Sequence, residues 1–73
     1  MEEGYRALAN AIVLNAVKDW RFTVRKLRKR PRYEPAKLLK QDCETFFLSE
    51  LFTVLTDCDG TILLNKLQEE ENL

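Results

Sequence analysis

The sequence lacks the residues on which most catalytic and metal sites depend. It contains no histidine and only two cysteines, Cys43 and Cys58. Without histidine, Ser-His-Asp and Cys-His nucleophile arrangements are impossible, and two isolated cysteines cannot build a tetrahedral zinc site. We therefore expect no catalytic residue, no cofactor and no bound metal ion.

Signals for export and for membrane insertion are also missing. The chain begins Met1-Glu2-Glu3, without the basic and apolar regions of a signal peptide. No apolar run approaches the length of a membrane span. We therefore expect no membrane contact, and a cytoplasmic protein whose two thiols stay free in a reducing compartment.

Glycine and proline, two residues of each, divide a chain that otherwise has helix-forming composition. Pro31 and Pro35 bracket a short polar segment, and Gly60 follows the acidic turn at residues 57–59. Seventy-three residues are enough for one domain with a small core. We predict a single all-α domain over residues 1–73, in which a long N-terminal helix and a second helix form a hairpin closed by two shorter helices.

The first predicted helix runs from about Glu3 to Lys29 and is apolar around a wide arc. One face carries apolar residues at steps of three and four: Ala9, Val13, Ala16, Val17, Trp20, Val24 and Leu27. Tyr5, Leu8 and Ile12 form a second stripe beside that face. One neighbouring helix cannot cover both stripes, so either the later helices fold back over the second stripe or another molecule covers it.

Three more helices are predicted after the prolines. The second starts near Glu34, Ser49 caps a short third helix, and Asp59 or Thr61 caps the fourth. Their predicted core residues are Ala36, Leu39, Cys43, Phe46, Phe47, Leu51, Phe52, Leu55, Ile62, Leu63, Leu64 and Leu67. The tail at residues 69–73 is expected to fray. Residues 54–56 and 61–64 could alternatively be two strands around a turn.

Residues 51–61 resemble the first motif of the haloacid-dehalogenase phosphohydrolases, an apolar strand followed by Asp-x-Asp-Gly-Thr. This resemblance would make Asp57 the nucleophile and Asp59 the acid/base, with Mg²⁺ held beside them. Only twelve residues follow Thr61, too few for the sheet and the further lysine and acidic residues that such chemistry needs. We predict instead a turn in which Asp59 caps the next helix and Gly60 adopts left-handed backbone angles.

The same turn does not fit a calcium-binding loop. An EF-hand loop needs glycine at its sixth position, whereas Gly60 is the fourth residue counted from Asp57. We therefore expect no calcium site.

Basic residues are concentrated in the middle of a chain whose net charge is zero. Nine basic residues and one acid lie between Arg21 and Lys40, whereas eight acids and one base follow from Gln41 onward. Such a cluster can contact phosphates, but it also suits a solvated helix C-terminus, and zero net charge weakens the nucleic-acid interpretation. The candidate contact residues of this segment are Arg25, Lys26, Arg28, Lys29, Arg30, Arg32 and Tyr33.

Phe22 is the one aromatic residue of the first helix that cannot share the core face. It lies about 200° around the helix from Trp20, so its ring points away from the predicted core. Phe22 is therefore a further candidate for an exposed contact residue.

Four segments of the chain resemble a family of short uncharacterised proteins encoded in prophages and integrative elements of Firmicutes. The segments are residues 9–14, 16–21, 46–49 and 55–60, and the likeness extends over residues 5–70. The family pattern includes the Asp-x-Asp-Gly turn, usually without the threonine found here. The resemblance implies a bacterial cytoplasm and an accessory gene of a mobile element, without an activity that could be transferred.

The function predicted from these observations is non-enzymatic protein binding. The chain would be a regulator, or an inhibitor of a host defence system, with an unidentified protein partner. Nucleic-acid binding through the basic segment at residues 25–33 is the alternative. Because one neighbouring helix cannot cover both stripes and the core is small, we also expect a homodimer; in the alternative, the two later helices cover the second stripe within one chain.

Overall fold

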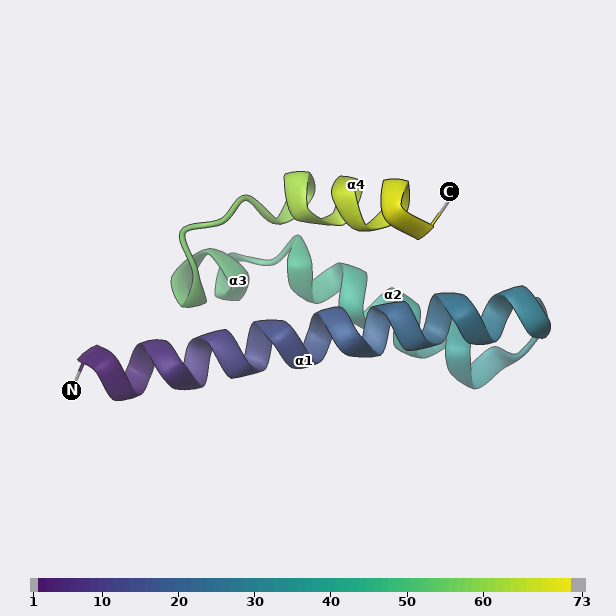
Figure 1. Ribbon diagram of the computed structural model, residues 1–73, viewed down its shortest axis with the longest axis horizontal. Coiled ribbons are helices and arrows are strands. Elements are labelled where there is room, and N and C mark those ends of the chain that lie inside the picture. Colours follow the sequence, from purple (N-terminus) through teal and green to yellow (C-terminus); the bar gives the residue numbers. More distant parts are fainter. Residues whose placement is uncertain (1, 72–73) are drawn as a thin grey trace.

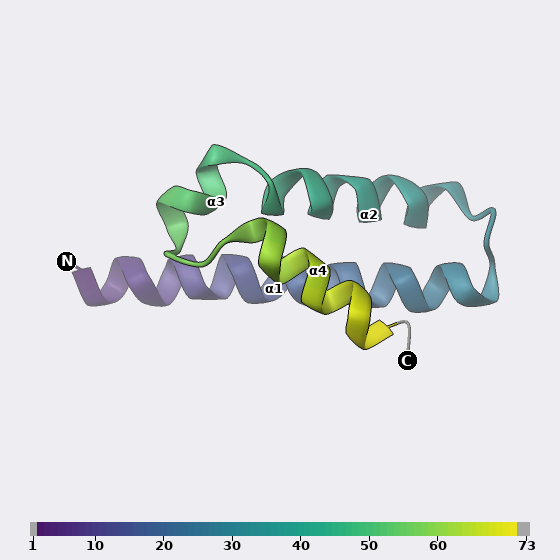
Figure 2. The same ribbon diagram turned by 90° about the horizontal axis from the view of Figure 1, so that it is seen from above.

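The computed structural model describes residues 2–71 and contains four helices (Figure 1). Their bounds are α1 Glu2–Lys29, α2 Glu34–Phe47, α3 Glu50–Leu55 and α4 Gly60–Glu71. α1 and α2 form an antiparallel hairpin, and α4 crosses one face of it (Figure 2). The predicted all-α fold is confirmed. Because residues 54–55 and 61–64 are helical, the alternative of two strands around a turn is wrong.

Proline and charge fix the connection between α1 and α2. Pro31 biases the residue before it away from helical angles, and α1 ends at Lys29. Basic side chains fill the last turn of α1, where they interact favourably with the helix dipole. Pro35 lies in the first turn of α2, where a missing N–H costs nothing. The short connection at residues 30–33 therefore returns the chain antiparallel to α1.

The core lies where the hairpin meets α3 and α4. Trp20, Phe47 and Phe52 are almost completely buried. The rings of Phe47 and Phe52 meet edge to face with their centroids 5.9 Å apart, an arrangement that aromatic pairs favour. The indole Nε1 of Trp20 donates a hydrogen bond of 2.9 Å to Oε2 of Glu44, so its polar edge is satisfied. Each fully buried apolar side chain contributes about 1.5–3 kcal/mol.

Side-chain caps start both short helices, as predicted. Oγ of Ser49 accepts a hydrogen bond of 3.3 Å from the N–H of Phe52 in the first turn of α3. Oδ1 of Asp59 accepts bonds of 2.8 and 3.3 Å from the N–H groups of Thr61 and Ile62. The cap of α4 is therefore Asp59. Such caps typically contribute about 1 kcal/mol.

Gly60 is required for close packing and not for a left-handed backbone. It is the first residue of α4 and is buried, and neither glycine in the described residues has a positive φ. The prediction of left-handed angles at this position is therefore wrong. A Cβ atom at Gly60 would overlap the carbonyl oxygen of Phe47 and lie 2.7 Å from the carbonyl carbon. The missing side chain lets the start of α4 touch the end of α2.

Three residues predicted for the core are exposed instead: Leu39, Leu51 and Ile62. Leu51 and Ile62 are exposed because α3 and α4 each present only one side to the core, whereas Leu39, in α2, is the least exposed of the three, at 38%. Ile62 lies two positions before the buried Leu64, which places it about 200° away around α4.

The acidic C-terminal end is folded, contrary to the prediction that residues 69–73 fray. α4 continues to Glu71, whose side chain is largely buried. Glu70 and Glu71 form ion pairs with α1, which hold this end in place. Residues 72–73 lie outside the described part of the chain.

Candidate protein-binding surface

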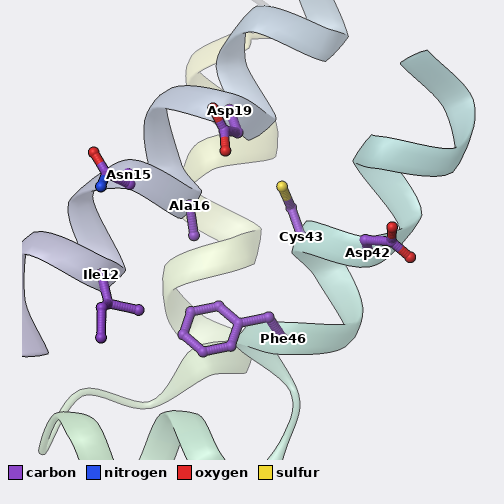
Figure 3. A pocket seen from close by; sticks show the side chains of 7 residues that line it. All are labelled: Ile12, Asn15, Ala16, Asp19, Asp42, Cys43 and Phe46. Carbon is purple, nitrogen blue, oxygen red and sulfur yellow. The ribbon is translucent and has the colours of Figure 1, made fainter. Parts of the chain in front are cut away.

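The hairpin is covered on one face only. α4 crosses one face, and on the opposite side a groove of about 340 Å³ runs between α1 and α2 (Figure 3). The lining residues are Ile12, Asn15, Ala16, Asp19, Asp42, Cys43 and Phe46. In the same view α4 is visible behind the hairpin, on the far side of the groove (Figure 3).

The groove has an apolar lining with two carboxylates beside it. Ile12 and Ala16 of α1 lie near Phe46 of α2, and Asp19 and Asp42 carry their exposed carboxylates on the two helices (Figure 3). Such a surface suits an apolar segment that also carries a basic or amide side chain.

The thiol of Cys43 borders the groove but is poorly suited to nucleophilic chemistry. Burial, followed by the nearby carboxylates of Asp19, Asp42 and Glu44, raises the pKa of the Cys43 thiol. A thiol with a raised pKa stays protonated at neutral pH, and the thiolate is the reactive form. The groove therefore offers a binding surface without a nucleophile.

The second stripe of α1 extends this apolar surface toward the N-terminus. Tyr5, Leu8 and Ile12 are 51%, 62% and 40% exposed. These three side chains, here called the apolar stripe, are therefore available for contact. A contiguous apolar surface on a small protein commonly marks a site of protein association.

The predicted basic segment is divided into two parts by α4. Arg25 and Arg28 lie 3.6 and 3.4 Å from the carboxylate of Glu71, and Arg21 lies 2.8 Å from that of Glu70. These arginines are directed at the acidic end of α4 and partly neutralised by it. The sequence had placed Arg25 and Arg28 among the contact residues, whereas the structure gives them an intramolecular role.

The remaining predicted contact residues lie at the tip of the hairpin and on the outer side of α1. Lys29, Arg30 and Arg32 are exposed, and no described carboxylate lies within 4.0 Å of them. The ammonium group of Lys26 lies 5.6 Å from the centre of the Tyr33 ring, a cation–π contact. Residues 30–33 border a shallow hollow at this tip.

Phe22 is 62% exposed on the outer side of α1, as its helical position predicted. Most of the Phe22 ring is open to solvent. It therefore remains a candidate contact residue.

The Asp-x-Asp-Gly turn does not have the local structure of the phosphohydrolase motif. Residues 51–55, where the phosphohydrolase motif has a strand, form α3, and Asp59 uses its carboxylate to cap α4. Within residues 2–71, no three histidine, cysteine or acidic side chains are placed to share a metal ion.

Four polar residues of the groove were not among the predicted contact residues: Asn15, Asp19, Asp42 and Cys43. Asn15 and Asp19 are one turn apart on α1, which is visible in the sequence. Their approach to Asp42 and Cys43 depends on the rotation of α2 against α1, a tertiary feature that helical periodicity does not specify.

Comparison of the chain with protein-family models, with curated proteins and with solved structures found no match. None of the helices within residues 2–71 is both long and apolar enough to cross a membrane.

Proposed function

We propose that this chain is a non-enzymatic protein-binding module. In this proposal it is an accessory protein of a phage or another mobile element. It acts in a bacterial cytoplasm by regulating or inhibiting a host protein. The setting rests on the sequence resemblance of residues 5–70, and the mode of action rests on the surface described above.

The observation that carries the proposal is the uncovered apolar surface of the hairpin. Tyr5, Leu8 and Ile12 stand beside a groove that reaches Phe46, on the face that α4 leaves open. Exposing such side chains to water gives a monomer no stability, whereas covering them with a partner recovers about 25 cal/mol for each Å² of apolar area.

Nucleic-acid binding through the tip of the hairpin is the second candidate. It is favoured by the exposed Lys29, Arg30 and Arg32 beside the aromatic ring of Tyr33. Against it, the ion pairs with Glu70 and Glu71 occupy three arginines of the same helix. A surface with so few unpaired bases makes few phosphate contacts.

Affinity capture with matched variants tests the proposal. Tagged wild-type protein, a Leu8→Glu variant and a Leu14→Glu control are incubated with nuclease-treated bacterial cytoplasm. Leu14 is as exposed as Leu8, at 58% against 62%, but lies about 120° away around α1. The proposal predicts a host protein retained at high salt by the wild type and the control, and lost with Leu8→Glu.

Two results would count against protein binding by this face. In one, Leu8→Glu and Leu14→Glu retain the same proteins as the wild type. In the other, binding is found only in cytoplasm that was not treated with nuclease, or falls steeply with salt, as phosphate contacts do, and is removed by Arg30→Glu together with Arg32→Glu.

A further inference from the structure

Eight side chains of α1 follow the alternating three- and four-residue spacing of a coiled coil, and three of them, Ile12, Asn15 and Asp19, also line the groove beside α2. The residues are Tyr5, Leu8, Ile12, Asn15, Asp19, Phe22, Lys26 and Lys29. All are exposed except Lys26, which is half-buried. This row, here called the α1 seam, begins with the apolar stripe and is separate from the face that holds Trp20 in the core. Sustained spacing of this kind is what a helix presents to a second helix.

We propose that the α1 seam binds the α1 seam of a second copy of this chain in an antiparallel orientation. The twofold axis crosses the pair at the level of residue 17, midway along the seam. The inference rests on the proposed function in one respect, that the apolar stripe is a protein-binding surface; here its occupant is a second copy of the chain and not a host protein. It adds the orientation and the register of the contact.

Charge and shape determine the register at the centre of the seam. In an antiparallel pair centred on Val17, residues whose numbers sum to 34 face one another. Ile12 therefore meets Phe22 of the second copy, which places two exposed apolar side chains together. Asn15 meets Asp19 of the second copy, so that an amide N–H₂ can donate to a carboxylate. The twofold axis repeats each pair.

The outer layers of the same register are also complementary. Leu8 faces Lys26 of the second copy, whose aliphatic stem can cover the leucine while the ammonium group stays in water. Tyr5 faces Lys29 of the second copy, which allows a cation–π contact. Every position of the α1 seam therefore has a suitable partner in this one register.

A parallel pair of the same helices would bring like charges together. Asp19 would face Asp19 of the second copy, Lys26 would face Lys26, and Lys29 would face Lys29. Like-charge contacts at an interface are unfavourable and select against the wrong arrangement. The charge pattern of the seam thus selects the antiparallel orientation.

Cross-linking between two proteins that each carry a single exposed cysteine tests the orientation directly. Leu8→Cys and Lys26→Cys are made in a Cys58→Ser background, because Cys58 is exposed whereas Cys43 is buried. The purified proteins, one of them tagged, are mixed and treated with a short bifunctional maleimide. Two Leu8 positions lie about 27 Å apart along the antiparallel pair, beyond the reach of the reagent, whereas positions 8 and 26 are adjacent. We expect roughly tenfold more mixed product than either homodimeric product.

A matched control and a second pair complete the experiment. Leu14→Cys replaces Leu8→Cys at an equally exposed site off the seam, and its mixed product with Lys26→Cys should be lost. Tyr5→Cys with Lys29→Cys tests the same register independently, should one variant fold poorly. Dominant homodimeric products, equal yields with Leu14→Cys, or no product from either pair would overturn the inference. No host protein is present in the cross-linking experiment. Its failure would therefore contradict the pairing of two copies without contradicting the binding of a host protein, which affinity capture tests separately.

Discussion

At the scale of single residues, two side-chain environments determine how the helices meet. Gly60 allows α4 to start against the last carbonyl of α2. Glu44 links the two helices of the hairpin, since its Oε2 accepts hydrogen bonds from Trp20 Nε1 at 2.9 Å and from Lys40 Nζ at 2.7 Å. Each environment predicts the effect of a small substitution.

Replacing Gly60 by alanine should destabilise the fold although alanine is the better helix former. The added Cβ would collide with the backbone of Phe47, so α4 or α2 must move, at a cost of about 1–3 kcal/mol. Gly4→Ala is the control, because nothing lies within 4 Å of a Cβ there, and up to about 0.5–1 kcal/mol should be gained. Urea unfolding measures the stability of both variants against the wild type. A Gly60→Ala protein as stable as Gly4→Ala would contradict the packing role of Gly60.

Glu44→Gln should lower stability at neutral pH and have no effect in acid. Burial alone would raise the pKa of Glu44, but the hydrogen bonds from Lys40 and Trp20 outweigh it, so the pKa lies below its ordinary value near 4.5. The carboxylate therefore stabilises the fold above that value, and its contribution is lost as the pH falls through the lowered pKa. The expected loss at pH 7 is about 1 kcal/mol.

Denaturant unfolding at several pH values between about 7 and 3 measures the difference in stability between the wild type and Glu44→Gln as the Glu44 carboxylate becomes protonated. Glu34→Gln is the control, because Glu34 forms only an exposed ion pair with Lys37 and should change little. If the gap between wild type and Glu44→Gln keeps the same size down to pH 3, the ionised carboxylate is not its source.

At the scale of helices, periodicity and capping residues predicted what depends on local sequence. Proline and the dipole-matched bases defined the ends of α1 and α2, and Ser49 and Asp59 were identified as caps. Leu39, Leu51 and Ile62 are exposed, contrary to the prediction that they lie in the core. The side of a helix that faces the core is set by packing against other helices, which the local sequence does not specify. The groove beside Phe46 and the return of Glu71 to Arg28 are also tertiary features.

The last turn of α4 should limit the binding of polyanions by α1. Glu70→Gln together with Glu71→Gln would release Arg21, Arg25 and Arg28 and should delay elution from a heparin resin to higher salt. Glu50→Gln with Asp57→Asn makes the same change in net charge away from these arginines and should have a smaller effect. Equal delays for the two double variants would show that net charge alone is responsible.

At the scale of the whole molecule, a small core coexists with an extended uncovered surface. The described chain is 43 Å long and 21 Å by 18 Å across, and α1 spans most of this length (Figure 1). A chain of this size buries only about 60% of its unfolded surface, so association is a common source of added stability. An antiparallel pair of α1 helices would cover the apolar stripe and leave the basic tips at opposite ends.

Sedimentation equilibrium of the wild-type protein, from about 1 to 100 µM, tests most directly whether the α1 seam associates. We predict a mass that rises with concentration from 8.6 kDa toward twice that value, accompanied by a melting temperature that rises with concentration. Phe22→Lys should hold the mass near 8.6 kDa, because it replaces the central apolar contact with Ile12 of the second copy by a charged side chain that pairing would remove from water. A wild-type mass of 8.6 kDa at every concentration, with a constant melting temperature, would contradict the account.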